Sequence, residues 1–591
     1  MALPALTLLG REPAERLRRA LLVALLLAGV LVFATIDRAD PDLWGHVRYG
    51  QDVLASWHLP ATATYTYTAA SQPWINHENL SEIAFAFVAD HAGGTGLAVL
   101  KTLLALGLLA LMMASARRQG AGIATTSVAV LLVTFATAPG WSFRPQVFTY
   151  AFFAVQVFVL DRVFGDGRTK PSETRLLWLL PPLFTLWANT HGGFVAGLGV
   201  LGVYLGCRGL ERLHADGRAG LRPAALYGAV ALACAGATLV NPYGLELLVW
   251  LVRDLVPPRP EIFEWRALSA SDTVFPLFVA ISALTGTAWL GTRQWRDRAR
   301  TALLIATAWQ SVTHVRHLPF FAIAAGFWLP AHLEPLLDRM RAILGRRQGT
   351  RAAGSGWAAT AVWVADLGLV VLVALHARAP LVDRSVYPVN AFRYMAKRHL
   401  TGKVVMHFDW AQYAIAAFGD DAPVAFDGRL RTCYPQDVAD AYFDFLVGDH
   451  LIPRWRAGGS PPFDAARMLH LGDPDLVVVA RHFTHSVEVM EAHPEWALLY
   501  QDAIAQLWGR RDRYDDPARA DYVPPARRWI TQVSHSGSVP WPALPPRRGN
   551  GKTSEASATS SRRSSGGRRD AVGVATCASR CRGATSRPSC R

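Results

Sequence analysis

Three aspartates stand directly after the first long apolar segment of the chain. Asp37, Asp40 and Asp42 follow the 16 mostly apolar residues 21–36. If that segment crosses a membrane, its end places the three carboxylates at the membrane surface. A carboxylate there can deprotonate or orient a nucleophile on a substrate that the lipid holds. Asp-Pro-Asp is also typical of a turn in which Asp42 caps the following helix, and this alternative stays open.

Basic and imidazole side chains recur at other turns between apolar segments. Arg144 lies in Trp-Ser-Phe-Arg-Pro-Gln, His191 in Asn-Thr-His-Gly-Gly, and Arg316 and His317 in His-Val-Arg-His-Leu-Pro. A planar guanidinium makes paired hydrogen bonds to phosphate, so these residues are candidates for binding a phosphorylated substrate. The alternative for both arginines is to anchor helix ends at the membrane interface. The alternative for His191 is to satisfy the backbone of a tight turn.

A third group of candidates lies between two amphipathic helical patterns, 43–57 and 79–89. Neither pattern is long enough to cross a membrane, so we expect both helices to lie in the interface. His77 and Glu78 stand just before the second helix, where they could bind substrate or simply cap the helix. The loop 37–95 therefore concentrates the candidate chemistry.

The composition is that of a membrane protein. Of 591 residues, 51% are hydrophobic, 20 are Trp and 26 are Phe, which is too apolar for a soluble domain. The hydropathy pattern predicts a polytopic α-helical membrane protein with about eleven transmembrane helices. The predicted segments are roughly 20–36, 96–115, 122–139, 146–163, 175–190, 193–207, 223–240, 272–291, 301–314, 318–333 and 357–377.

The arginines predict the orientation of these helices. With eleven segments, the basic clusters all fall on one side, which the positive-inside rule assigns to the cytoplasm. We therefore expect a multi-pass protein of the cell (inner) membrane with a cytoplasmic N-terminus, a retained first segment and an extracytoplasmic C-terminal part. The clusters lie at residues 11–19, 117–118, 162–175, 208–222, 293–300 and 339–351.

The chain divides into three parts by composition: a multi-span part (1–379), an extracytoplasmic α/β domain (380–522) and a disordered basic tail (523–591). Buried strands are predicted at 404–408 and 476–480, with helices at 389–398, 436–446 and 484–492 and a closing strand pair over 496–508. Asp427-Gly428-Arg429 follows a short strand, where it forms a solvated turn or reaches back over the membrane site.

The tail accounts for most of the net charge of +15. It carries 13 Lys and Arg residues but only Glu555 and Asp570 as acids. The remaining basic residues are topology signals, so we expect no nucleic-acid partner.

The layout resembles the GT-C superfamily of membrane glycosyltransferases. The resemblance rests on Asp37 to His46 after a short first span, on Trp74 to Glu82 in a long first loop, and on many spans followed by an outer domain. It implies transfer of a sugar from a polyprenyl-phosphate carrier to a lipid, glycan or protein acceptor, in contact with membrane lipids. Many relatives carry an Asp-Glu pair in this loop. This chain has three aspartates without an adjacent Glu, so the base remains open among Asp42, Asp40 and Asp37.

The same resemblance raises the question of a metal, because the oligosaccharyltransferases of that superfamily hold a divalent cation. The residues that could hold one here show no tight ligand spacing, so no metal ligand or cofactor is assigned. They are Asp40, Asp42, His46, His77, Glu78 and Glu82. Three other functions stay open: a polysaccharide polymerase or ligase, a transporter, and a non-catalytic scaffold.

Overall fold

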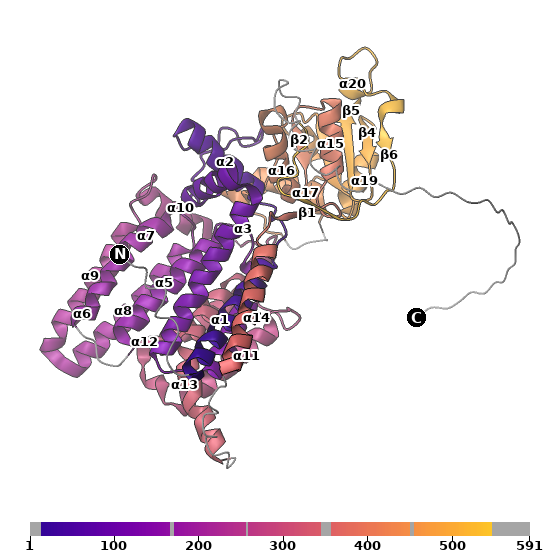
Figure 1. The fold of residues 1–591 in the computed structure, drawn as a ribbon. Coiled ribbons are helices and arrows are strands. Elements are labelled where there is room, and N and C mark those ends of the chain that lie inside the picture. The colour runs from indigo at the N-terminus through magenta and orange to yellow at the C-terminus, as the bar shows by residue number, and fades with distance from the viewer. Residues whose placement is uncertain (1–12, 166–170, 256–257, 344–355, 450–453, 547–591) are drawn as a thin grey trace, which may run out of the picture. The chain divides into compact units, whose positions relative to one another are not determined.

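The computed structural model describes residues 13–165, 171–255, 258–343, 356–449 and 454–546, and these are mostly helical up to residue 376 (Figure 1). Within them, seven helical stretches are long and apolar enough to cross a membrane. The polytopic helical class is thereby confirmed. The stretches are Glu15–Ala34, Asn79–Arg118, Ile123–Gly140, Gln146–Phe164, Phe194–Ala237, Val315–Ile343 and Trp357–His376.

The number of membrane crossings stays a prediction. Each of the eleven expected segments coincides with a helix, but several of these helices are short. α7 (Leu180–Ala188) has 9 residues, α12 (Arg298–Thr313) has 16 and α11 (Phe275–Gly291) has 17. A span normally needs about 20 residues. The other helices of this part are α1 (Pro13–Ala34), α4 (Ile123–Thr137), α5 (Gln146–Phe164), α8 (Phe194–Asp216), α9 (Leu221–Ala237), α10 (Leu245–Leu255), α13 (Leu318–Ile343) and α14 (Gly356–His376).

The second expected interface helix is not separate. It is the first part of α3 (Asn79–Arg118), which continues through a kink at Gly93 into the second span. Gly93 has φ 60° and ψ −160°, a conformation that side chains strongly disfavour. A helix occurs at the first of the two expected positions, α2 (Leu43–Ser56), and its place in the membrane interface stays a prediction.

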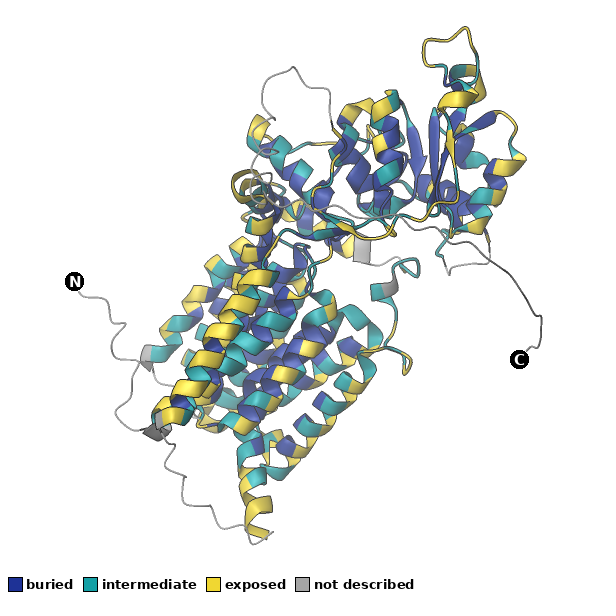
Figure 2. Ribbon diagram, turned by 45° about the vertical axis from the view of Figure 1, so that its right-hand side comes forward, coloured by how far each residue is buried: buried dark blue, intermediate teal, exposed yellow. Residues whose placement is uncertain are grey.

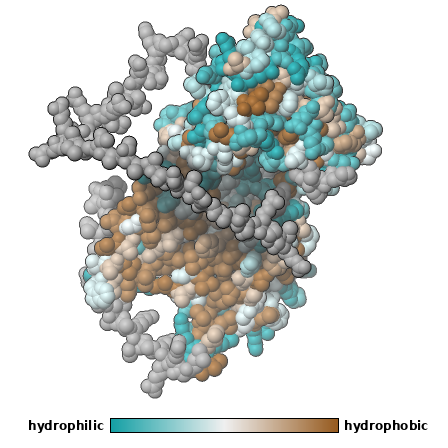
Figure 3. Space-filling view, turned by 90° about the vertical axis from the view of Figure 1, so that its right-hand side faces the viewer, coloured by the Kyte–Doolittle hydropathy of each residue, from teal (hydrophilic) through white to brown (hydrophobic). Residues whose placement is uncertain are grey.

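Apolar side chains face outward from the helices, as lipid requires. Leu232 is 74% exposed and Leu210 68% exposed, although both are large and apolar. Figure 2 shows exposed residues along the outer faces of the helices, and Figure 3 shows hydrophobic residues gathered over the helical part. Hydrophilic residues cover most of the C-terminal segment, by which we mean residues 380–546.

The C-terminal segment contains a five-stranded mixed sheet in the order β2-β3-β5-β4-β6. The strand β3 (Leu476–Ala480), which lies between β2 and β5, is buried along its whole length, as expected for a run of apolar residues with both faces covered. The predicted helices and strands occur with nearly the predicted bounds. They are β2 (Val404–Met406), β4 (Trp496–Gln501), β5 (Ala505–Arg510), α15 (Val389–Arg398), α17 (Gln436–Val447) and α19 (Thr484–Ala492), whereas α16 (Phe408–Phe418) was not predicted.

The ordered chain extends past residue 522, where we expected disorder to begin. β6 (Trp529–Ile530) pairs with β4, and β7 (Ser538–Pro540) pairs with β1 (Leu381–Asp383). The composition of this stretch is turn-like, but its backbone finds partners far away in sequence, and Trp541 is buried. Residues 547–591 of the expected tail lie outside the described residues.

The membrane part and the C-terminal segment belong to one compact unit that reaches Pro545. The Trp44 indole of α2 donates a hydrogen bond to Pro542 O (2.9 Å) and stacks near Tyr413 of α16. The first loop also pairs with residues near β2, because Val424 N–H donates to Tyr65 O (2.9 Å). The loop after the first span is therefore held between the two parts of the chain.

A buried ion-pair cluster joins several helices within the helical part of the chain. The Asp161 carboxylate, fully buried in α5, pairs with Arg118 Nη2 (2.8 Å) and Arg300 Nη2 (3.3 Å). The same carboxylate accepts hydrogen bonds from Trp328 Nε1 (3.2 Å) and Ser115 Oγ. It thus links four helices, α3, α5, α12 and α13.

Asp161→Asn should destabilise the protein by about 3–5 kcal/mol, because buried guanidinium groups lose their counter-charge. The control is Asp338→Asn, which removes an exposed pair with Arg341 and should cost less than about 1 kcal/mol. Thermal unfolding of the detergent-solubilised protein measures both. Equal unfolding midpoints for the two variants would contradict the central role of Asp161.

Candidate active site

A cavity of about 440 Å³ lies where the helix ends meet the C-terminal segment. It brings together most of the residues that the sequence singled out, from segments far apart along the chain. Asp42, His77, Glu78, Arg144, His191 and Arg316 all line it. The residues that the sequence analysis did not name include Glu261, Glu264 and Trp265 of the loop after α10, and Phe408, Asp409 and Gln412 of α16.

Three expected site residues, Asp37, Asp40 and His317, do not line the cavity. The backbone of Asp37 pairs with β1, where Leu381 N–H donates to Asp37 O (2.7 Å). His317 shares a hydrogen bond between its Nδ1 and Gln310 Oε1 (3.1 Å) and packs against Phe320. Of the three aspartates, Asp42 is therefore the one whose carboxylate reaches the cavity.

Arg144 holds three carboxylates that come from different segments. Its Nε lies 2.7 Å from Asp40 Oδ1, its Nη2 3.1 Å from Asp42 Oδ2, and its Nη1 3.3 Å from Glu264 Oε1. Asp40 is 9% exposed and is fixed in this pair, whereas Asp42 also opens to the cavity. Arg144 is thus a partner of the carboxylates and not an isolated interface anchor.

Asp42 does not cap the following helix through its side chain. It occupies the position before α2, but its carboxylate makes no capping hydrogen bond. Its own N–H donates to Asp40 Oδ1 (3.1 Å), so Asp40 shapes the turn. Burial, opposed by Arg144 and reinforced by the charge of Asp40, raises the pKa of Asp42 to about 6. A carboxylate with that pKa accepts a proton near neutral pH more readily than an exposed one.

The C-terminal segment closes over Asp42 through the turn Asp427-Gly428-Arg429. A Cβ on Gly428 would lie 2.3 Å from Asp42 Oδ1, so only a glycine permits this approach. Asp427 is fully buried and pairs with Arg429 (2.7 Å), whose guanidinium lies over the rings of Tyr49 and Trp74. The expectation of a solvated turn is therefore wrong for these buried residues.

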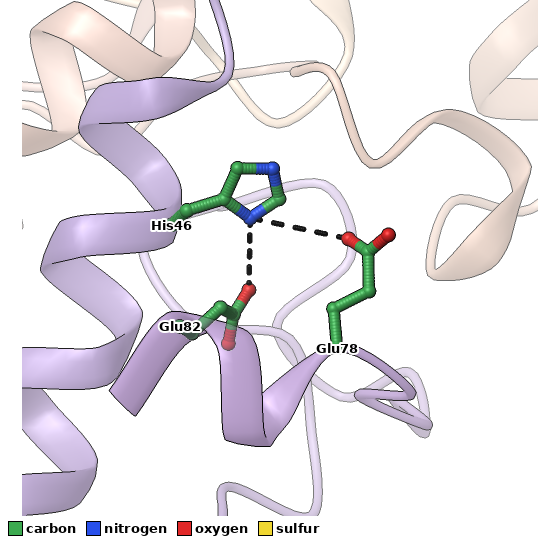
Figure 4. Close-up of side chains that lie close together, drawn as sticks. All are labelled: His46, Glu78 and Glu82. Carbon is green, nitrogen blue, oxygen red and sulfur yellow. Dashed lines mark hydrogen bonds and ion pairs between the residues drawn. The ribbon is translucent and has the colours of Figure 1, made fainter. Parts of the chain in front are cut away.

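His46, Glu78 and Glu82 form a second polar cluster (Figure 4). His46 Nδ1 lies 3.2 Å from Glu82 Oε1 and 3.9 Å from Glu78 Oε2. Burial alone lowers the pKa of His46, but the hydrogen bond to Glu82 and the charge of Glu78 outweigh it and raise that pKa to about 9. Glu78 precedes α3 without capping it through its side chain.

This cluster does not fit a resident divalent cation. Ligand atoms of its three members lie within 4.8 Å of one another. However, a carboxylate can only accept, so His46 Nδ1 carries a hydrogen and offers no lone pair to a metal. The second oxygen of Glu82 accepts from Asn76 Nδ2 (2.5 Å). Asp40 and Asp42, the other acidic candidates, already bind Arg144.

His191 stands opposite this cluster. Its Nδ1 lies 2.9 Å from Thr149 Oγ1 and 3.0 Å from Gly193 N, and its Nε2 lies 3.7 Å from Glu78 Oε1. Burial, despite the opposing charge of Glu78, lowers the pKa of His191 to about 3, so the ring is neutral near pH 7. His77 Nε2 lies 3.8 Å from the same Glu78 oxygen.

Arg316 is the cation of the site that could bind an anionic substrate group. Its guanidinium lies 4.7 Å from the centre of the Trp265 ring, whose other contacts include Arg259 at 4.8 Å. In the part of the chain that the structure describes, no acidic side chain forms a salt bridge with Arg316. A cation that faces a cavity without such a partner can receive a phosphate.

The amino-acid sequence matches no family model and no curated protein, but solved structures share its fold. ArnT from Cupriavidus metallidurans, solved with undecaprenyl phosphate, matches with a TM-score of 0.51 and 12% identity over 85% of this chain and 98% of ArnT. The oligosaccharyltransferase AglB from Archaeoglobus fulgidus, solved with an inhibitory peptide and a dolichol-phosphate, matches with a TM-score of 0.52 and 11% identity over 78% of this chain and 70% of AglB.

The chain therefore shares the fold of AglB and ArnT. This confirms the resemblance at the level of fold, which at such low identity is what the comparison carries.

Replacing His46 should lower stability in a pH-dependent way. A folded pKa of about 9, above about 6.5 in the unfolded chain, stabilises the fold fully below pH ~6.5 and stops doing so as the pH rises through about 9. His46→Gln should therefore cost on the order of 2 kcal/mol at pH 6 and little at pH 10. Thermal unfolding between these pH values measures the difference.

Two controls make this measurement decisive. His58→Gln changes an exposed histidine and should have no such pH dependence. Added Zn²⁺ should not raise the unfolding midpoint of the wild type. A rise that disappears in His46→Gln would contradict a protonated His46, because a metal that binds the folded state stabilises it.

Proposed function

We propose that the protein is a membrane glycosyltransferase that moves a sugar from a polyprenyl-phosphate carrier to an extracytoplasmic lipid, glycan or protein acceptor. One observation carries the proposal: the cavity holds both a carboxylate that can accept a proton, Asp42, and a guanidinium that forms no salt bridge with any described acidic residue, Arg316. We further propose that the N-terminus is cytoplasmic and that the C-terminal segment lies outside the inner membrane.

The reaction needs a base for the acceptor. Asp42 would take the proton from the acceptor hydroxyl or amide as its oxygen or nitrogen attacks C1 of the sugar. Arg144 keeps the carboxylate in place, and the charge of Asp40 favours its protonation. Asp40 itself is engaged by Nε of Arg144 and has little exposed surface, so we assign it a positioning role.

The reaction also needs a cation for the leaving group. As the bond between C1 and the phosphate oxygen breaks, its electron pair remains on the carrier phosphate, whose negative charge increases. Arg316 and the neutral His191 would stabilise that charge from positions fixed before the reaction. The dolichol-phosphate on AglB and the undecaprenyl phosphate on ArnT support a carrier of this chemical class.

Asp42→Asn should lower transfer about 10²- to 10⁴-fold, the usual loss on removing a general base. The measurement is mass spectrometry of envelope glycans and lipid-linked sugars in a deletion strain that expresses wild type or variant. The matched control is Asp90→Asn, an exposed carboxylate of α3 away from the cavity. Full restoration by Asp42→Asn at equal membrane levels, or no missing glycan in the deletion strain, would refute the proposal.

Gly428→Ala should lower transfer by about 10- to 100-fold without unfolding the protein, because the new methyl group must displace the Asp42 carboxylate. Gly459→Ala is the control, since a Cβ there meets no atom within 4 Å. Both variants are assayed as above. Wild-type activity of Gly428→Ala would show that the position of Asp42 tolerates a shift and would weaken its assignment as the base.

A further inference from the structure

The ring orientation of His191 is fixed by groups that lie outside the cavity. Gly193 N–H points at His191 Nδ1 from 3.0 Å, and a backbone N–H can only donate. The Gly193 N–H therefore favours Nδ1 as the accepting nitrogen. In a neutral imidazole the single hydrogen then sits on Nε2, the nitrogen that faces Glu78 across the cavity.

Thr149 supports the same tautomer from the other side. Trp187 Nε1–H, which can only donate, points at Thr149 Oγ1 from 2.8 Å. The hydroxyl hydrogen of Thr149 is thereby directed toward His191 Nδ1, 2.9 Å away. Thr149 is 1% exposed and Trp187 is fully buried, so no water competes for these bonds.

The backbone is built to permit this arrangement. A Cβ on Gly193 would lie 2.6 Å from Thr149 Oγ1 and 3.0 Å from His191 Nδ1. Glycine at this position therefore allows the α7–α8 turn to close around the histidine. This close packing explains the Gly-Gly that follows His191 in the sequence.

This arrangement leaves the hydrogen on His191 Nε2 available in the cavity. Its distance of 3.7 Å from Glu78 Oε1 is too long for a hydrogen bond. The Nε2–H is thus held in the cavity, oriented and available to an acceptor atom of a substrate. Arg316 lines the same cavity as His191.

We propose that Thr149 is a positioning residue that fixes His191 as the Nε2–H tautomer, so that His191 donates a hydrogen bond to a phosphate oxygen of the lipid carrier. The proposal rests on the proposed function for the identity of the ligand. It assigns His191 the role of a hydrogen-bond donor, not of an acid or base that exchanges protons during the reaction.

The experiment compares Thr149→Val, which keeps the shape but removes the hydroxyl, with Thr149→Ser, which restores it. Thr137→Val is the matched control, because the Thr137 hydroxyl bonds only to carbonyls of its own helix, the nearer 2.7 Å away, among the residues described. The first readout is ¹⁵N NMR of the full-length protein with labelled histidine, in which His191→Gln identifies the His191 signals. The second is the affinity for undecaprenyl phosphate in detergent micelles.

We expect the wild type, Thr149→Ser and Thr137→Val to show the hydrogen on Nε2 and similar affinities. Thr149→Val should show a mixture of tautomers and about tenfold weaker binding. The proposal is overturned if Thr149→Val keeps both the tautomer and the affinity of the wild type. It is also overturned if the wild type carries the hydrogen on Nδ1, a result that needs no variant to fold apart from the one used for assignment.

The two readouts separate this proposal from the proposed function. If the wild type shows the Nε2–H tautomer but does not bind undecaprenyl phosphate, the carrier assignment fails, and with it the role given to the N–H. If the wild type binds but the tautomer does not depend on the Thr149 hydroxyl, only the positioning role fails.

Discussion

The ion pairs of Arg144 are the interaction on which the site depends. A single guanidinium joins Asp40 and Asp42, just after the first helix, to Glu264 in the loop after α10. Three carboxylates so close together would repel one another without that charge. Because the planar group offers several donors in fixed directions, it also sets where each carboxylate points. The position of Asp42 follows from this geometry.

The C-terminal segment also helps to position Asp42, because it packs closely against the helix ends. Gly428 lies against Asp42, and a Cβ on Gly45 of α2 would lie 1.8 Å from Gln412 Oε1 of α16. In addition, Arg431 of the C-terminal segment forms an ion pair with Glu261 (2.6 Å), in the loop that also carries Glu264. The glycines leave room for the segment to approach the helix ends, and the ion pair holds it there. We therefore regard the C-terminal segment as part of the site itself.

The sequence predicts those features that depend on local pattern. The bounds of α15, α19 and β3 agree with the predicted ones because amphipathic periodicity and an unbroken apolar run are visible within ten residues. The pairing of β6 and β7 with distant strands leaves no local signal in the sequence. The predicted start of the disordered tail therefore lies too early in the chain. The same reason explains why Asp40 and Asp42 could not be told apart. Both precede the same helix, and only the cavity, which distant segments form and which Asp42 alone of the two lines, separates them.

The histidines of the site show most clearly that protonation states cannot be predicted from the sequence, because they depend on contacts made in the fold. His46 and His191 are both buried at the cavity, yet the first is protonated and the second neutral near pH 7. The difference arises from their partners. His46 donates to a carboxylate, which stabilises its positive charge, whereas His191 accepts from a backbone N–H and a hydroxyl, which leaves the ring no means to hold a second proton without losing those bonds.

This pairing also explains how the cavity can collect so many acids without a metal ligand set. Arg144 lies beside Asp40 and Asp42, and His46 lies beside Glu78 and Glu82, so the protein places its own cations next to its carboxylates. Arg316, which has no such acidic partner among the described residues, is then left to attract an anion from outside. Because an anion is attracted to a cation and repelled by carboxylates, the phosphate of a substrate would be directed to Arg316 and not to the acidic cluster beside it.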